Sequence, residues 1–156
     1  FLTTQNRLNA MSQLHELLYQ KDDVSYVNAY EYFSTLIEGL EETYTDDINI
    51  NYAIDADLQT EQAISSGIIL NELVTNSLKY AFTSDTGEID ISLSKDGTIY
   101  TLIIRDNGIG YDQENNKKSF GLILVDTLVS SKLKGEMVIN TQNGVETKIT
   151  WSEINE

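Results

Sequence analysis

Two hairpin signals constrain the fold of this chain more than any other feature of its sequence. Apolar and polar residues alternate over 89–94, the pair Asp96-Gly97 follows, and an apolar segment returns. A second pair of segments, over 136–152, turns at Asn143-Gly144. Asp-Gly and Asn-Gly between alternating segments are strong signals of β-hairpins. The sequence therefore predicts a sheet that contains two antiparallel hairpins.

Helical periodicity accounts for most of the remaining chain. Apolar residues recur at helical spacing over residues 2–20, then over a second helix with Ser25 as its N-cap, and again over about 60–81. A short alternating strand, 48–54, lies between the second and third helices. This order predicts an α+β fold, a two-layer sandwich with helices on one face of a mixed, mostly antiparallel sheet.

Composition excludes several classes of function. The chain has 156 residues, of which 40% are hydrophobic, and no cysteine, so we expect one globular core without disulfides or thiolate metal sites. The net charge of −15 argues against nucleic acid and anionic membrane surfaces as partners. No apolar run reaches the ~20 residues of a membrane span. The lack of cysteine suits a reducing, cytoplasmic interior, and because the chain does not begin with Met we expect a fragment of a longer protein, whose own membrane anchoring is left open.

The segment 70–81 closes the third helix and carries polar side chains in one stripe. Glu72, Asn76 and Lys79 stand at i, i+4 and i+7, on one face of a regular α-helix. A carboxylate, an amide and an amine in one stripe can meet a metal-bound phosphate. A solvated helix face explains the same spacing, so the motif alone leaves both interpretations open.

The polar segment 106–119 is the long connection between the hairpins, and such connections are usually functional lids or disordered segments. It begins with Asp106 and continues to Gly110 as D-N-G-I-G, directly after an apolar strand. A carboxylate at the end of a buried strand needs a hydrogen-bond donor, and the exocyclic amine of a purine would be a fitting one. An ordinary Asp-Asn-Gly turn is the alternative.

The same segment ends at Ser119, where Gly121 and Leu122 open a helix expected over about 120–133. A small residue and a glycine at a helix start leave backbone N–H groups free to hold phosphate. A serine N-cap without any ligand is the alternative.

Taken together, these pieces resemble the ATP-binding domain of sensor histidine kinases, in the superfamily that shares the Bergerat ATP-binding fold. Residues 71–81 resemble its N-box, 106–110 its first glycine box, 119–124 its second and 143–147 its terminal G-x-x-T element. The second box departs from the richer G-x-G-x-G of many relatives, which implies a weaker phosphate grip or one that ATP orders.

The N-terminal part extends the resemblance. Gln5 to Tyr19 is similar to the end of the second dimerisation helix in the subclass whose dimerisation region is of the second HisKA type. The resemblance implies two units, with residues 1–22 as the truncated end of the dimerisation region and 23–156 as the ATP-binding catalytic domain.

For the phosphate end of the site, the resemblance implies Mg²⁺ and ATP as ligands. Asn76 would be a Mg²⁺ ligand, and Glu72 would orient water on the metal or act as a base. Lys79 would face the phosphates. Gly121 and Leu122 would give the phosphates access to the helix N-terminus.

For the adenine end, the resemblance implies that Asp106 accepts a hydrogen bond from the adenine amine. Gly108 and Gly110 would shape the pocket, and Tyr80 would pack on the adenine. Thr147 would support Asp106 through its hydroxyl or a water.

His15 is the only histidine, and His15-Glu16-Leu17 looks like the start of the H-E-L-R-x-P acceptor box. Leu18 follows instead of the arginine, and there is no proline. In the subclass resembled, the acceptor lies on the preceding helix, so His15 is expected to be a packing residue. The resemblance thus implies a homodimeric kinase that passes the γ-phosphoryl to an upstream histidine, for relay to a response regulator.

Three alternatives remain at this point. A serine kinase of the anti-sigma-factor type shares the fold but lacks a preceding dimerisation helix. A Bergerat-fold ATPase would use Glu72 as a base on water. A degenerate, non-catalytic interaction domain would bind no nucleotide.

Overall fold

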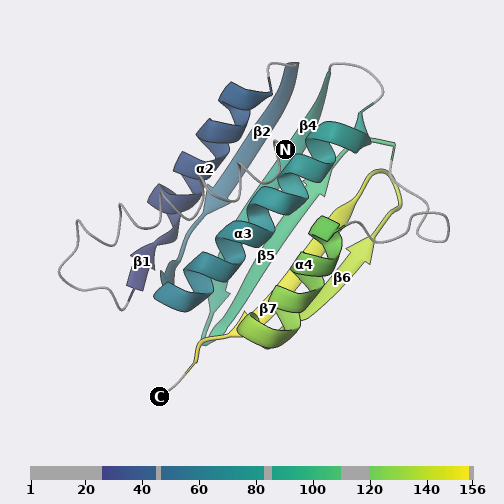
Figure 1. Cartoon of the computed structure of the whole chain (residues 1–156). Coiled ribbons are helices and arrows are strands. Elements are labelled where there is room, and N and C mark those ends of the chain that lie inside the picture. Colours follow the sequence, from purple (N-terminus) through teal and green to yellow (C-terminus); the bar gives the residue numbers. More distant parts are fainter. Residues whose placement is uncertain (1–25, 45–46, 83–85, 110–119, 155–156) are drawn as a thin grey trace.

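The computed structural model describes residues 26–44, 47–82, 86–109 and 120–154 (Figure 1). In this part of the chain three helices lie on one face of a five-stranded sheet, which confirms the predicted two-layer α+β sandwich. The helices are α2 (Ala29–Thr43), α3 (Thr60–Asn76) and α4 (Phe120–Leu128). Helix α3 is the central one and packs between α2 and α4. The helix expected over 2–20 lies outside the described residues.

The sheet is mixed, as predicted, with the strand order β2-β4-β5-β7-β6. Its strands are β2 (Asp47–Ile54), β4 (Thr86–Asp96), β5 (Ile99–Asp106), β6 (Glu136–Asn140) and β7 (Glu146–Ser152). Strand β2 runs parallel to β4, and every other pair is antiparallel. The parallel pair needs a crossover connection, and α3 provides it.

Both predicted hairpins are present. In the first, Asp96 pairs with Ile99, so the turn is centred on Gly97-Thr98, one residue later than Asp96-Gly97. Gly97 has a φ of 63°, the left-handed conformation that glycine adopts without strain, and this fixes the position of the turn. In the second hairpin Asn143 and Gly144 both have positive φ, at 58° and 106°.

A second, two-stranded sheet was not predicted. Strand β1 (Tyr26–Asn28) pairs antiparallel with β3 (Asp57–Gln59), and Val27 lies opposite Leu58, both buried. Because residues 26–28 are extended, α2 begins later than expected, and its N-cap is Asn28 rather than Ser25. The Asn28 side chain accepts a hydrogen bond from the Glu31 backbone N–H at 3.1 Å.

The core lies between the helices and the sheet. It takes Phe33 and Ile37 from α2, Leu70 from α3, and Ile91 and Leu102 from the sheet. Helix α3 is buried along almost its whole length, and that explains why its apolar residues show only weak amphipathic periodicity. Among the described residues, no helix has the length and apolar character needed to cross a membrane.

Candidate nucleotide-binding site

Asp106 is the last residue of β5, and its carboxylate is buried, with 2% of the residue exposed. Its Oδ1 accepts hydrogen bonds from the backbone N–H groups of Gly108, at 3.0 Å, and Val145, at 3.1 Å. Its Oδ2 accepts one from the Ser77 hydroxyl at 2.8 Å. Each carboxylate oxygen can accept about two hydrogen bonds. The carboxylate is therefore held in one orientation by three donors, and Oδ2 can still accept from a further one.

The three described donors to the Asp106 carboxylate are all neutral. Among the residues that the structure describes, no lysine or arginine forms an ion pair with it. Neutral donors fix its direction but leave the negative charge to attract a donor from a ligand. An amine on a purine ring is one donor that fits the remaining acceptor position of this carboxylate.

The loop after β5 lies directly on the end of the central helix. The Ile109 N–H donates to the Ala81 carbonyl at 2.7 Å, and a side chain at Gly108 would collide with that same carbonyl oxygen. Asn107 fastens the loop to β4, because its side chain accepts from the Glu88 N–H at 2.8 Å. Only glycine at position 108 lets the loop backbone approach Ala81 this closely. The predicted role of Gly108 in shaping the pocket stays a prediction.

A third segment reaches Asp106 from the second hairpin. A side chain at Gly144 would collide with the Asp106 carbonyl oxygen, so the turn before β7 packs on the end of β5. Thr147 is buried on β7 opposite Ile104, but the hydrogen bond to Asp106 from this segment comes from the Val145 N–H. The expected support through the Thr147 hydroxyl or a water stays a prediction.

The end of α3 changes its winding at the site. The α-helix ends at Asn76, and a π-helical turn, η1 (Ser77–Ala81), continues it. Such turns insert an extra residue and are frequent at functional sites. This turn brings Ser77 against Asp106, while Lys79 and Tyr80 are exposed, Tyr80 by 69%.

The predicted stripe of three polar residues is therefore only partly regular. Glu72 and Asn76 keep their i, i+4 relation on α3, with Glu72 only 1% exposed and Asn76 half-buried. Lys79 follows in η1, where the wider turn alters the i+7 spacing that a regular α-helix would give. Glu72 and Lys79 thus sit in very different surroundings, one inside the protein and one in solvent.

Two neighbouring donors on α3 test whether the site fits a polar ligand. Asn71 and Thr75 are 2% and 1% exposed, and neither Asn71 Nδ2 nor Thr75 Oγ1 has a hydrogen-bond partner in the part of the chain that the structure describes. Buried polar atoms are almost always satisfied. Unsatisfied donors beside Glu72 and Asn76 therefore fit a site that takes a polar ligand.

The chemistry of the donors fits magnesium better than a metal held by the protein alone. Among the described residues there is no group of three or more histidine or carboxylate side chains that could hold a metal ion. Magnesium binds oxygen, keeps several waters and is usually held by one or two side chains together with substrate phosphates. The Asn76 amide oxygen, one turn from the Glu72 carboxylate, fits such a minimal ligand set.

The phosphate end of the site is described only in part. Gly121 is buried in the first turn of α4, and Leu122 is half-buried. The first N–H groups of a helix have no partners within it, so this turn presents donors that can hold an anion. Gly110 and residues 111–119 lie outside the described residues.

The sequence did not indicate the two donors that most directly fix Asp106. Ser77 could be placed there only by knowing that the helix becomes π-helical after Asn76. The Val145 N–H lies 39 residues from Asp106. It is a main-chain donor, so the apolar side chain of Val145 does not indicate the hydrogen bond. The one available signal was the Asn143-Gly144 turn.

Comparisons with known proteins agree with this geometry. Residues 63–155, more than half of the chain, match the family described as "Histidine kinase-, DNA gyrase B-, and HSP90-like ATPase". The chain therefore belongs to this family of ATPases, and the resemblance to sensor histidine kinases is confirmed. Residues 1–44 match the HisKA_2 family, described as "Histidine kinase", which confirms the predicted subclass.

Individual relatives point the same way. The chain is 34% identical over 85 residues to the signal transduction histidine-protein kinase/phosphatase DegS of Brevibacillus brevis, covering 54% of this chain and 21% of the relative. It is 26% identical over 139 residues to the sensor histidine kinase PdtaS of Mycobacterium tuberculosis, covering 84% and 28%. The chain thus spans between a fifth and a third of the length of these relatives.

A solved structure shows the same fold. The histidine kinase domain of a blue-light-activated histidine kinase from Erythrobacter litoralis superposes with a TM-score of 0.88 at 19% identity, covering 97% of this chain and 75% of that one. The HisKA_2 match runs to residue 44 and so includes β1 and α2, whose buried residues join the same core as the sheet. The boundary expected between residues 22 and 23 stays a prediction.

Proposed function

We propose that this domain binds Mg-ATP and that the kinase to which it belongs transfers the γ-phosphoryl to a histidine upstream of residue 1. The observation that carries the proposal is the buried Asp106 carboxylate, held by three neutral donors and able to accept one more. The relay to a response regulator aspartate and a homodimer formed through the dimerisation region belong to the same proposal, and the HisKA_2 match supports the dimer.

The adenine would be recognised at the end of β5. Its exocyclic amine would donate to Asp106 Oδ2, a charge-assisted hydrogen bond that contributes about 1.5–3 kcal/mol. Gly108 would shape the pocket indirectly, because its lack of a side chain lets the loop after β5 pack on the Ala81 carbonyl. The exposed Tyr80 ring would pack on the base, exchanging water for an aromatic surface.

The triphosphate would extend toward the start of α4. Lys79 would neutralise phosphate charge, and the first N–H groups of α4, at Gly121 and Leu122, would bind phosphate oxygens. Gly110 would complete the loop on the adenine side. Because the chain carries a net charge of −15, these local positive groups and a divalent cation are needed to offset its repulsion of an anionic nucleotide.

Magnesium would be held by Asn76 and by the phosphates, and when bound it neutralises charge on the transferring group. Glu72, one helical turn away and almost fully buried, would orient water around this position or accept a proton. Phosphoryl transfer depends mainly on positioning and charge neutralisation, so these residues act by placing the γ-phosphate.

The experiment uses radiolabelled ATP and a longer form of the protein that includes the upstream histidine. An acid-labile, base-stable label on the protein identifies phosphohistidine. Acid-stable label on serine would support the serine kinase alternative, and free phosphate without labelled protein would support the ATPase. No bound nucleotide at all would support the degenerate interaction domain.

The metal assignment has its own test. Asn76→Asp should change the relative affinity for Mg²⁺-ATP and Mn²⁺-ATP more than it changes the affinity for metal-free ATP, because it alters the metal contact directly. An equal loss with and without metal would contradict the assignment.

A further inference from the structure

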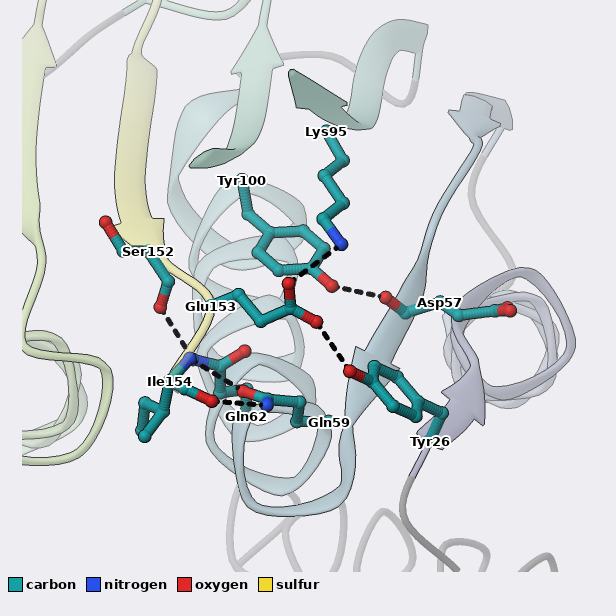
Figure 2. A network of polar contacts seen from close by, with 9 residues as sticks. All are labelled: Tyr26, Asp57, Gln59, Gln62, Lys95, Tyr100, Ser152, Glu153 and Ile154. Carbon is teal, nitrogen blue, oxygen red and sulfur yellow. Dashed lines mark hydrogen bonds and ion pairs between the residues drawn. The ribbon is translucent and has the colours of Figure 1, made fainter. Parts of the chain in front are cut away.

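The C-terminal segment Ser152–Ile154 lies at the end of the sheet opposite Asp106, because Ser152 pairs with Ile99 at the start of β5. Figure 2 shows the polar contacts that this segment makes. Gln59, at the end of β3, pairs with both main-chain groups of Ile154, donating to its carbonyl at 2.7 Å and accepting from its N–H at 2.9 Å. Gln62, in the first turn of α3, donates to the Ser152 carbonyl at 2.9 Å. The segment is thus tied to the start of the central helix and to β3.

Glu153 connects this segment to two further strands. Its Oε1 accepts from the Tyr26 hydroxyl of β1 at 2.6 Å, and its Oε2 accepts from Lys95 of β4 at 3.2 Å. Its backbone N–H donates to the Thr98 carbonyl, in the turn of the first hairpin, at 2.7 Å. The Glu153 side chain is only 14% exposed, so it is partly shielded from solvent while it makes these bonds.

Tyr100 adds a further connection to β3, through Asp57 (Figure 2). Its hydroxyl donates to the Asp57 carbonyl at 2.6 Å, and its ring stacks on Trp151 with centroids 5.5 Å apart. Lys95 lies 5.1 Å from the centre of the same ring. Strand β3 is therefore fixed both by the sheet and by the C-terminal segment.

The β1–β3 ribbon depends on such outside contacts. The ribbon has only three residue pairs. Isolated two-stranded ribbons are at best marginally stable in water. It is also the point at which the HisKA_2 match, residues 1–44, enters the part of the chain that the structure describes. The contacts that hold this ribbon therefore hold the point at which the described part of the chain begins.

We propose that residues 152–154 form a C-terminal clasp that holds the β1–β3 ribbon against the sheet and thereby positions the preceding region for phosphoryl transfer. Tyr26 and Glu153 are positioning residues in this device and do not contact the nucleotide. The inference rests on the proposed kinase function. It gives a structural role to residues 152–154, which take no part in the proposed nucleotide site.

The test uses two conservative variants, each with a matched control. Tyr26→Phe removes one hydroxyl, and Tyr30→Phe does the same on the neighbouring helix, where Tyr30 contacts Tyr52 instead. Glu153→Gln removes one charge, and Glu136→Gln does the same on the exposed edge strand β6. Amide hydrogen exchange of the 156-residue chain reports local opening of β1 and β3.

Both clasp variants should raise exchange in β1 and β3 about fivefold over the wild type, with exchange in β5 and β7 unchanged. In the full-length kinase they should lower the rate of histidine phosphorylation about fivefold at an unchanged KM for ATP. The double variant should raise exchange by less than the product of the two single effects, because both changes weaken the Tyr26–Glu153 contact, while only Glu153→Gln also removes the charge that pairs with Lys95.

The controls should leave exchange and phosphorylation at wild-type values. Unchanged exchange in both clasp variants would overturn the clasp. Faster exchange with an unchanged phosphorylation rate would overturn its positioning role. The proposed function is tested separately, since it fails when the wild-type kinase forms no phosphohistidine.

Discussion

Two carboxylates, one at each end of β5, are both held by groups that lie far away in the sequence, and their surroundings differ. Asp106 is buried and accepts from two backbone N–H groups and one serine hydroxyl. Glu153, near the start of β5, is partly exposed and accepts from a tyrosine and a lysine. Neutral, fixed donors leave the charge of Asp106 to act on a ligand, whereas the lysine beside Glu153 neutralises its charge within the protein.

Under the proposed function Asp106 recognises a ligand, whereas Glu153 makes a structural contact. The Asp106 carboxylate is held by neutral donors and can accept one more hydrogen bond at Oδ2, and the proposed function gives that position to the ligand. An ion pair near the surface contributes little on its own, so Glu153 matters through the segments that it joins. Changing each carboxylate in the same way should therefore have opposite outcomes for nucleotide binding and for the β1–β3 ribbon.

The largest effect is expected for Asp106→Asn. The amide keeps the size of the side chain and can still accept from Gly108 and Val145, but it removes the charge, so ATP affinity should fall about 100-fold or more. Calorimetric titration measures it. Glu153→Gln is the matched control and should leave ATP affinity within about twofold. Binding of ATP to Asp106→Asn within twofold of the wild type would contradict the adenine assignment.

A smaller effect is expected for Gly108→Ala. The added methyl group would collide with the Ala81 carbonyl oxygen, so the loop must move away from η1, at a cost of about 1–3 kcal/mol in folding stability and about tenfold in ATP affinity. In Gly39→Ala the methyl group meets nothing within 4 Å, and this helix-interior change should stabilise the fold by about 0.5–1 kcal/mol. Thermal unfolding and ATP titration report both. Equal stability of the two variants would argue against the close packing of the loop on η1.

Ser77→Ala tests the serine donor to the buried Asp106 carboxylate. Asp106 loses one of its three donors and is held less firmly, so ATP affinity should fall about fivefold. Ser66→Ala is the control, because Ser66 is also buried, lies on α3 just before η1, and donates to the Ala63 carbonyl instead. Should both variants bind ATP like the wild type, Ser77 would have no part in orienting Asp106.

The smallest effect is a pH dependence at the other end. The hydrogen bond from Tyr26 and then the bond from Lys95 lower the pKa of Glu153 below its ordinary 4.5, and the groups that face it are Tyr26, Lys95 and Tyr100. Because the pKa of Glu153 is lowered, the contact stabilises the folded protein fully at pH values above the ordinary pKa of 4.5. This stabilisation is lost as the pH falls through the pKa that Glu153 has in the folded protein.

The bond to Glu153 also raises the pKa of Tyr26 above 10.0 and of Lys95 above 10.5. For these two groups stabilisation is complete below the ordinary values and is lost as the pH rises through the raised ones. Protection factors of β1 and β3 should therefore be constant from about pH 5 to 9 and fall as the pH drops below 4.5 and through the lowered pKa of Glu153. In Glu153→Gln this acid loss should disappear. Its persistence would assign the loss to another group.

The parts that the sequence predicted well are those set by local chemistry. The alternation of residues 89–94, the Asn143-Gly144 turn and the D-N-G run after an apolar strand each depend on a few neighbouring residues, and the structure contains all three features. The layer architecture followed from their order. Turn residues and side-chain alternation carry this information because the backbone itself requires them.

The parts that were not predicted depend on distant contacts or on a change of helical winding. Tyr26 and Glu153 are 127 residues apart, and nothing in either neighbourhood indicates the other. The β1–β3 ribbon has three pairs and hardly any pattern of its own. The π-helical turn after Asn76 keeps the composition of an α-helix, so periodicity could not show that Ser77 would face Asp106.

The central claim is that Asp106 recognises the amine of adenine. The most direct measurement is a calorimetric titration of the chain, in Mg²⁺, with ATP and with inosine triphosphate, which has a carbonyl oxygen in place of that amine. Our account predicts that ATP binds and that the inosine analogue binds at least about 100-fold more weakly, since a site built to bond an amine rejects the analogue that lacks it. Equal affinity for the two nucleotides would contradict the assignment.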